Sequence, residues 1–318
     1  MKNTTKLFTS IALVLMLFLP ACAKPASTTN PVSNPNSDEK VLKVVATTTM
    51  LADLSRVIGG DKVSVSGLMG PGIDPHLYQA SAGDVTLMQK SDVVVYNGLH
   101  LEGKMGEIFE NLTGQGYTVI CIGDGIDQSK LLEWEEEDSL HDPHIWFDVA
   151  LWKQAAKVVA DGLSKAASEH ADYFKANYES YAKALDETDT YIKKRVHEVP
   201  EPARVLVTAH DAFNYFGRAY GFEVRGLQGI STDAEAGTAD VSDLATFIVE
   251  RQIKAIFIES SVPHKTIEAL QAAVKAKGFD VAIGGKLYSD SLGGVGSGAE
   301  NYIQTVKANI DTIVDALK

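Results

Sequence analysis

The chain has 318 residues, of which 45% are hydrophobic and 22% are charged, so it is long enough for two domains with a sizeable core. This composition excludes a wholly disordered chain and a protein with many membrane spans. The formal net charge of −13 disfavours nucleic acid as a partner and favours a cation. Two cysteines are too few for a disulfide framework.

Residues 1–21 are predicted to be a signal peptide. Lys2 and Lys6 precede an apolar run at 7–19, which is too short to cross a bilayer as a helix. The run ends in Leu-Pro-Ala-Cys, and small residues followed at once by Cys22 are similar to the lipobox of bacterial lipoproteins, whose cysteine is acylated. We expect Cys22 to carry a lipid anchor, and an ordinary signal peptide is the alternative.

Residues 22–40 are predicted to form a lipidated N-terminus and a flexible tether. The segment is rich in Pro, Ser, Thr and Asn and has almost nothing to bury. A globular protein anchored outside the cytoplasmic membrane is in a compartment that lacks ATP and most cofactors. The expected task is therefore ligand binding and not intracellular chemistry.

Residues 41–168 and 201–318 are each predicted to form an α/β lobe. In both segments short β-branched runs alternate with helical patterns, which is typical of βα units and mainly parallel sheets. Strands are expected at 42–46, 63–68, 92–96, 118–122, 205–208, 222–225, 255–258 and 280–283. Helices are expected near 50–58, 81–89, 102–112, 211–220, 240–252, 263–276 and 299–317.

The segment 169–200 between the lobes is predicted to be one long linking helix. Apolar residues recur at steps of three and four from Phe174 to Val196, and Pro200 ends the pattern. A helix of this length spans roughly 45 Å. Because the apolar face is aromatic and contains Thr, a coiled-coil dimer is disfavoured, and we expect a strut that lies across both lobes.

The candidate site residues come shortly after predicted strands. Ligands of parallel α/β sheets bind at the carboxyl ends of the strands, and His76, His210 and Asp290 lie in such places, as does the motif His141-Asp-Pro-His144. Three imidazoles and a carboxylate suit Zn²⁺ or Mn²⁺, whereas Ca²⁺ and Mg²⁺ prefer oxygen ligands. Each histidine taken singly is more simply a structural or surface residue, and spacing alone leaves His141 and His144 equivalent.

Together these motifs resemble a known family. The lipobox, Pro75-His76, His141-Asp-Pro-His144-x-Trp146, Thr208-Ala-His210-x-Ala-Phe213 and Ser289-Asp290 are similar to the metal-binding lipoproteins of bacterial ABC importers for zinc and manganese, the solute-binding protein 9 family. The resemblance runs from about Lys43 to near the end of the chain.

The resemblance implies a receptor with two α/β lobes, one long backbone helix and a metal cleft between the lobes. One Zn²⁺ or Mn²⁺ ion would be bound by His76, His144, His210 and Asp290, but not by His141. The implied partners are an ABC importer permease with its cytoplasmic ATPase and, through the lipid anchor, the outer side of the cell membrane. A monomer is expected.

The choice of metal stays open in the sequence. By the resemblance, His at position 210 is typical of zinc receptors and of receptors for both metals, whereas Glu there is typical of manganese receptors. By the same resemblance, dedicated zinc receptors often carry a His-rich loop before the His-Asp-Pro-His motif. Here the corresponding residues 133–138 are acidic and contain no histidine. From the usual affinity order for nitrogen and oxygen ligands, we expect Zn²⁺ to bind more tightly than Mn²⁺ in vitro.

Other residues and functions remain as alternatives. His100 is a candidate for a supporting role or an alternate ligand, and Glu259 is a candidate for a hydrogen bond to a ligand imidazole. His170, His197 and His264 are read as surface residues. A secreted zinc hydrolase is an alternative function, but Asp290 would fill the coordination position that catalysis needs open, so no enzyme is expected. An adhesin stabilised by its metal is a third reading.

Overall fold

The computed structural model describes residues 41–134 and 139–318, and residues 40–318 cluster as one compact unit. The predicted signal peptide, Cys22, the tether and residues 135–138 of the acidic loop lie outside the described residues. Within the described part of the chain, no helix is both long and apolar enough to cross a membrane.

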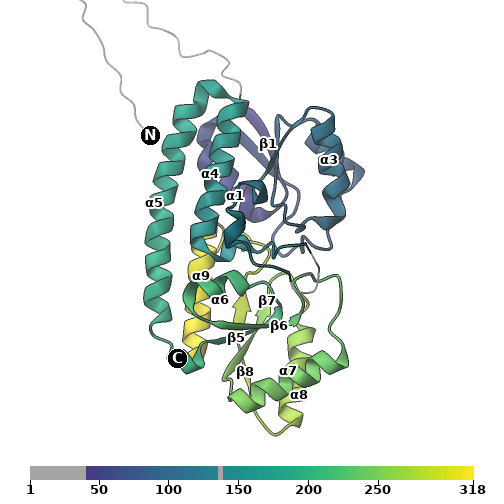
Figure 1. Ribbon diagram of the computed structural model, residues 1–318, viewed down its shortest axis with the longest axis vertical. Coiled ribbons are helices and arrows are strands. Elements are labelled where there is room, and N and C mark those ends of the chain that lie inside the picture. The colour runs from purple at the N-terminus through teal and green to yellow at the C-terminus, as the bar shows by residue number, and fades with distance from the viewer. Residues whose placement is uncertain (1–40, 135–138) are drawn as a thin grey trace, which may run out of the picture. The chain divides into compact units, whose positions relative to one another are not determined.

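The N-terminal lobe is a parallel sheet covered by helices (Figure 1). Its strand order is β2-β1-β3-β4, with β1 (Leu42–Ala46), β2 (Val63–Gly67), β3 (Val93–Tyr96) and β4 (Thr118–Cys121). The connecting helices are α1 (Thr49–Gly59), α2 (Ala82–Gln89) and α3 (Gly106–Gly114). The two central strands are rich in valine because parallel strands with helices on their faces are buried on both sides.

The C-terminal lobe contains two pairs of parallel strands. β5 (Val205–His210) pairs with β6 (Glu223–Gln228), and β7 (Ala255–Glu259) pairs with β8 (Ala282–Leu287). The helices of this lobe are α6 (Asn214–Tyr220), α7 (Thr238–Arg251), α8 (Lys265–Ala276) and α9 (Tyr302–Leu317). The parallel α/β class is confirmed in both lobes.

The predicted last strand at 280–283 was placed too early. β8 begins at Ala282 and continues to Leu287, through Gly284 and Gly285. Two glycines have low strand propensity, so the β-branched pattern of the sequence ends at Ile283. Hydrogen bonding to β7, with an irregularity in register between Ile256 and Phe257, carries the strand onward.

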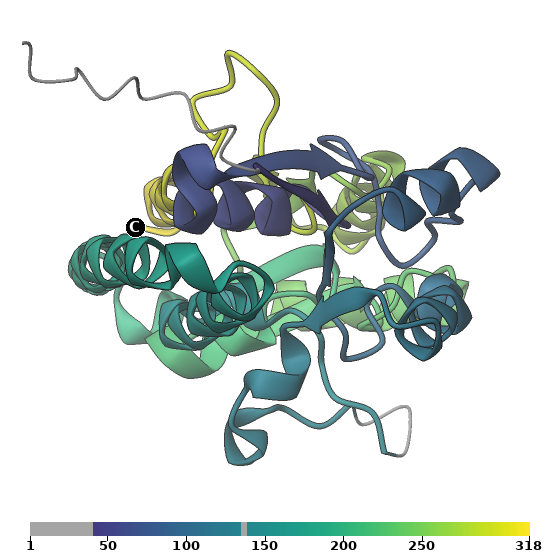
Figure 2. The ribbon, with the colours of Figure 1, turned by 90° about the horizontal axis from the view of Figure 1, so that it is seen from above.

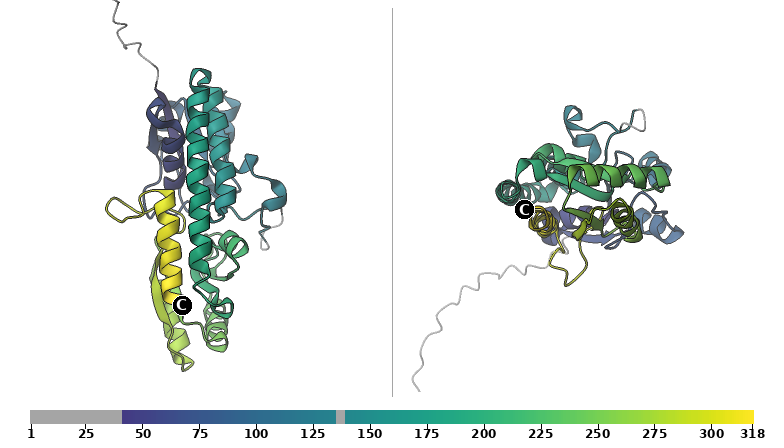
Figure 3. Two further views of the ribbon diagram at one scale, coloured as in Figure 1. Left: turned by 90° about the vertical axis from the view of Figure 1, so that its left-hand side faces the viewer. Right: turned by 90° about the horizontal axis from the view of Figure 1, so that it is seen from below.

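The long helix is present as α5 (Ala171–Val196). It contacts α1 and α4 of the N-terminal lobe and α9 of the C-terminal lobe, as the side view shows (Figure 3). Its buried face comprises Phe174, Tyr181, Leu185, Thr188, Ile192 and Val196. The predicted strut across both lobes is confirmed.

The helix that precedes it, α4 (Val149–Ala166), was missing from the prediction. Ala155, Ala156 and Ala160 contribute much of its buried face, and alanine gives little hydrophobic contrast. The available signal was Asp148, whose side chain caps the helix by accepting from the backbone nitrogens of Ala150 and Leu151. Seen from above, α4 and α5 lie side by side (Figure 2).

One histidine prediction on this hairpin is wrong. His170 is buried between α4 and α5, with its ring 6.0 Å from that of Phe174, whereas His197 and His264 are exposed as predicted. The sequence indicated only that His170 begins a helix. Packing of the α4–α5 connection against the lobe buries the side chain.

The largest hydrophobic cluster runs through both lobes. It includes Leu54 of α1, Leu185 of α5 and Ile310 of α9, and Trp152 of α4 stacks on Tyr302 of α9 with ring centroids 4.9 Å apart. Trp152 Nε1 also donates to the hydroxyl of Tyr181 on α5. A shared core of this kind resists a wide hinge motion between the lobes.

Candidate metal centre

Four side chains from separate parts of the chain meet at one buried point. His76 lies in the loop between β2 and α2, His144 before α4, His210 at the end of β5 and Asp290 after β8. One ligand atom from each lies within 4.8 Å of the corresponding atom of every other. The structure therefore brings together all four residues that the sequence proposed as metal ligands.

The distances between neighbouring ligand atoms are those of a small coordination sphere. His76 Nε2 lies 3.3 Å from His144 Nε2, and Asp290 places Oδ1 3.5 Å from His144 Nε2 and Oδ2 3.3 Å from His210 Nε2. Zinc binds nitrogen and carboxylate ligands at about 2.0–2.2 Å, so the ligands of a tetrahedral zinc ion lie about 3.3–3.6 Å apart. These three pairs fit that geometry.

The polar atoms of the site are buried and incompletely hydrogen-bonded. All four side chains are at most 3% exposed. Within the described part of the chain, His210 Nε2 and Asp290 Oδ1 lie beside oppositely charged groups of the site but make no hydrogen bond of good geometry. Because buried polar atoms without partners are costly, their convergence on one point indicates a ligand that they bind in common.

Two of the imidazoles are oriented by buried carboxylates. Asp142 Oδ1 lies 2.8 Å from His144 Nδ1, and Glu259 Oε2 lies 2.6 Å from His210 Nδ1. Each carboxylate favours the tautomer with hydrogen on Nδ1, which leaves the Nε2 lone pair directed at the shared point. Such carboxylate–histidine pairs are characteristic of metal sites in which the imidazole binds through its other nitrogen.

A repeated Asp-Pro-His turn positions two of the ligands. The sequence Asp74-Pro-His76 recurs as Asp142-Pro-His144, and in each the aspartate Oδ1 accepts a hydrogen bond of 2.9 Å from the backbone nitrogen of the histidine. This local Asx turn fixes the backbone of the histidine two residues on. Asp142 also contacts the ring of its histidine, whereas Asp74 uses its second oxygen elsewhere.

The carboxylates around the site shift its pKa values strongly. Burial lowers the pKa of His144, but Asp142 and Asp290 outweigh it and raise that pKa to about 9. Burial is likewise outweighed at His210, where Glu259 and Asp290 hold the imidazole pKa well above its ordinary value. Burial raises the pKa of Asp290, but the two imidazoles hold it well below the usual range.

His76 behaves differently from the other two histidines. Burial lowers its pKa to about 3, and the nearby Asp290 opposes this only in part. With His76 neutral, the centre combines three imidazoles with the buried carboxylates of Asp142, Glu259 and Asp290. A divalent cation at their common point would balance this negative charge.

The structure separates the two histidines that spacing left equivalent. His141 is half-buried, forms a bridge to Glu133 and does not belong to the group of four. His100 is also outside the group: it is exposed, and its ring lies 6.4 Å from that of Trp134. Glu259, in contrast, contacts a candidate ligand directly.

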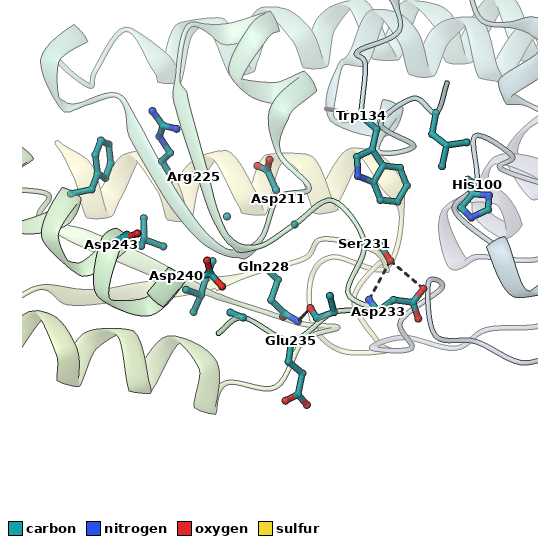
Figure 4. Close-up of a pocket in the computed structure, with 18 residues that line it drawn as sticks. His100, Trp134, Asp211, Arg225, Gln228, Ser231, Asp233, Glu235, Asp240 and Asp243 are labelled. Atoms are coloured by element: carbon teal, nitrogen blue, oxygen red, sulfur yellow. Dashed lines mark hydrogen bonds between the residues drawn. The ribbon is translucent and has the colours of Figure 1, made fainter. Parts of the chain in front are cut away.

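His100 and Trp134 line a groove beside the centre with a volume of about 1040 Å³. They face Ser231 and Asp233 of the C-terminal lobe across it (Figure 4). Acidic side chains of Asp211, Asp233, Glu235, Asp240 and Asp243 also line the groove.

Asp142 and Asp74 were not among the predicted site residues. Both stand two residues before a ligand histidine, and the repeated Asp-Pro-His was the signal that could have identified them. Thr232, which contacts Asp74 from the other lobe, left no comparable local signal.

Comparisons with known proteins agree along nearly the whole described chain. A family model described as "Zinc-uptake complex component A periplasmic" matches residues 44–316. The zinc-binding protein TroA of Treponema pallidum (strain Nichols) is 49% identical over 274 residues, which cover 86% of this chain and 88% of that protein. The manganese-binding lipoprotein MntA of Bacillus subtilis (strain 168) is 45% identical over 282 residues, which cover 89% of this chain and 92% of that protein.

A solved structure described as the periplasmic zinc-binding protein TroA from Treponema pallidum has the same fold. It aligns with a TM-score of 0.84 and 49% sequence identity, covering 87% of this chain and 99% of that chain.

Proposed function

The chain belongs to the family of the periplasmic component A of zinc-uptake complexes, and from this premise we propose that His76, His144, His210 and Asp290 bind one divalent transition-metal ion. Membership confirms the resemblance seen in the sequence and supports the receptor function, in place of the secreted hydrolase or the metal-stabilised adhesin. The chain is a transport receptor of an ABC importer and not an enzyme.

The proposal rests on four buried ligand atoms that lie within 4.8 Å of one another. Two of them come from the proposed lobe 41–168 and two from the proposed lobe 201–318. Three neutral nitrogens and one carboxylate form a donor set that suits Zn²⁺ and Mn²⁺. With four protein ligands in place, an ion is held without an open position for catalysis. A site with four protein ligands and no open position is suited to the capture and release of an ion.

The proposed cargo is zinc, manganese or both. One similar protein is named for zinc and another for manganese, so similarity alone does not select between them. A nitrogen-rich site of this kind follows the usual affinity order, in which Zn²⁺ binds more tightly than Mn²⁺. We propose that Zn²⁺ has the lower Kd in vitro, while the supply of each ion outside the cell decides which is carried.

We further propose that Cys22 is acylated after removal of residues 1–21 and that residues 22–40 tether the protein to the outer face of the membrane. The Leu-Pro-Ala-Cys motif supports this anchor, as does the description of a 45%-identical relative as a lipoprotein. The proposed lobes are 41–168 and 201–318, joined by the helix segment 169–200. The receptor acts as a monomer and passes its ion to the importer's permease, which works with a cytoplasmic ATPase.

The test is metal analysis of the purified full chain, followed by chelation and parallel calorimetric titrations with Zn²⁺ and Mn²⁺. We expect one ion per chain and a lower Kd for Zn²⁺. The variant Asp290→Asn, which removes the ligand charge at nearly constant shape, is expected to weaken binding of both ions strongly, and Asp240→Asn in the groove serves as a matched control. Absence of stoichiometric binding, or equal affinity of Asp290→Asn and the unsubstituted chain, would refute the proposed site.

A further inference from the structure

Three of the four ligands are attached to the C-terminal lobe. His210 and Asp290 belong to that lobe, and the segment that carries His144 is bound to it by side-chain contacts. The ring of Phe147 packs against Phe213 with centroids 4.1 Å apart, and Trp146 Nε1 donates to the carbonyl oxygen of Ser289 over 2.9 Å. His144, His210 and Asp290 therefore form one platform.

Further hydrogen bonds hold the His144 segment on α6. The Tyr215 hydroxyl donates to the carbonyl oxygen of Asp142 over 2.8 Å, and the backbone nitrogen of Leu132 donates to the same hydroxyl over 3.0 Å. From the N-terminal lobe, the side chain of Asn97 donates to the carbonyl oxygen of Pro143 over 3.1 Å. The contacts with the C-terminal lobe outnumber this hydrogen bond and make it costly to separate His144 from His210.

His76 belongs instead to the loop at residues 68–81 of the N-terminal lobe. Among the described residues, two hydrogen bonds join this loop to the C-terminal lobe: the backbone nitrogen of Gly72 donates to Ser291 Oγ, and the hydroxyl of Thr232 donates to Asp74. On either side of the ligand, Ile73 and Leu77 are exposed. The loop of the fourth ligand thus depends on few hydrogen bonds for its place against the C-terminal lobe.

Asp74 connects His76 to the opposite lobe through its two oxygens. Oδ1 accepts from the backbone nitrogen of His76 over 2.9 Å, and Oδ2 accepts from the Thr232 hydroxyl over 2.6 Å. Thr232 is 7% exposed, so this charge-assisted hydrogen bond is largely shielded from water. A neighbouring ion pair between Lys104 and Asp233, at 2.8 Å, also spans the lobes but is solvent-exposed and contributes little.

We propose that Asp74 and Thr232 form an interlobe clasp that holds His76 against the three-ligand platform and limits the rate at which the bound ion is released. Asp74 and Thr232 are positioning residues that do not bind the ion. When their hydrogen bond breaks, the loop at 68–81 moves away with His76, and the ion keeps three ligands and gains an exit. The inference rests on the proposed function, because it requires an ion at this centre.

The loop at 229–237 provides a matched control for this clasp. Ser231 and Asp233 line the groove, where Ser231 contacts Asp233 within the loop (Figure 4). Thr232, between them, is not among the groove residues and reaches Asp74. Removing the Ser231 hydroxyl therefore perturbs the same loop without opening the clasp.

The experiment measures zinc release from the loaded full chain by stopped-flow mixing with an excess of a chromogenic chelator. Thr232→Val, which removes the donor and keeps the side-chain shape, is expected to release zinc roughly 10-fold faster or more, since a hydrogen bond to a charged group is lost. Thr232→Ser should restore the slow rate, and Ser231→Ala should retain it. The association rate of Thr232→Val should not fall.

Two further measurements separate a clasp from general destabilisation. The Tm of metal-free Thr232→Val is expected to stay within roughly 4 °C of the unsubstituted chain. In a double-mutant cycle, Asp74→Ala combined with Thr232→Val should release zinc no faster than Asp74→Ala alone, because both act on one contact. If Thr232→Val folds poorly, Thr232→Ala gives the same comparison.

Unchanged release from both Thr232 variants, or equal acceleration by Ser231→Ala, would overturn the clasp. Failure of Thr232→Ser to restore the slow rate would do the same. These results would leave the proposed function standing as long as the unsubstituted chain binds one ion. If that chain binds none, the proposed function itself fails.

Discussion

Glu259 places one carboxylate oxygen 2.6 Å from His210 Nδ1 and the other 2.8 Å from the backbone nitrogen of the same histidine. Both residues are fully buried. The carboxylate therefore fixes the ring, the tautomer and the backbone of His210 together, so that Nε2 points at the metal centre. Asp142 contacts both the ring Nδ1 and the backbone nitrogen of His144, but through the single oxygen Oδ1.

These carboxylates should contribute strongly to affinity without binding the ion. We expect Glu259→Gln and Asp142→Asn each to raise the Kd for Zn²⁺ roughly 10- to 100-fold, the range typical of residues that orient metal-binding histidines. The measurement is a competition titration against a chelator of known affinity. Glu235→Gln, an exposed carboxylate of the groove, is the control, and an equal effect there would indicate general electrostatic attraction instead.

The two histidines of the His141-Asp-Pro-His144 motif should respond oppositely to substitution. His144→Ala removes a buried ligand and is expected to abolish stoichiometric zinc binding, whereas His141→Ala should bind zinc with nearly unchanged Kd. Metal content after dialysis, measured by mass spectrometry, distinguishes the two variants. Loss of zinc from His141→Ala with retention by His144→Ala would reverse the assignment.

Metal affinity should fall as the pH falls. The pKa of His144 is raised to about 9 and that of His210 is also raised, so both imidazoles are protonated near neutral pH without metal, and an ion must displace their protons. His76, with a pKa of about 3, is already neutral, so the ion displaces no proton from it. We therefore expect the Kd for Zn²⁺ to rise about 10- to 100-fold per pH unit lowered between pH 8 and 6.

Titrations in buffers of different ionisation enthalpy test this directly, because they count the protons released on binding. Release of one to two protons per ion at pH 7 is expected. A Kd independent of pH over this range would contradict the raised pKa values. The ordinary histidine pKa, which is all that the sequence supplies, would place the loss of affinity only near pH 6.5.

Removal of the metal should leave the fold intact. The hydrophobic core runs through both lobes without depending on the metal centre, so circular dichroism of the chelated chain should keep the helical signal. Reloading to about 1000 times Kd is expected to raise the free energy of unfolding by about 4 kcal/mol, seen as a higher Tm. Unfolding on chelation would instead favour a protein that uses its metal for structure.

The long helix should limit the motion between lobes. Because α5 contacts α1 and α4 at one end and α9 at the other, scattering curves of the metal-free and zinc-loaded chains should nearly superimpose. Local movement of the loop at 68–81 is compatible with this result. A large change in radius of gyration between the two states would contradict a rigid strut.

The four candidate ligands could be proposed from the sequence because each ends or follows a strand and belongs to a recognisable motif. The long helix could be predicted as well, since its buried face recurs at steps of three and four, or their sum, from Phe174 to Val196, over about six turns. α4 was missed because its alanine-rich buried face differs little in hydrophobicity from its exposed face. β8 was placed too early because its glycines have low strand propensity and adopt the strand through pairing with β7.

The amino-acid order by itself determined the parallel α/β class, the linking helix and which side chains are chemically able to bind a transition metal, because periodicity and local motifs are properties of neighbouring residues. Only the tertiary structure decided that His144 and not His141 joins the centre, that His170 is buried, and that Thr232 reaches Asp74 across 158 positions of the chain. Contacts of that kind depend on how separate elements pack, and no local pattern records them.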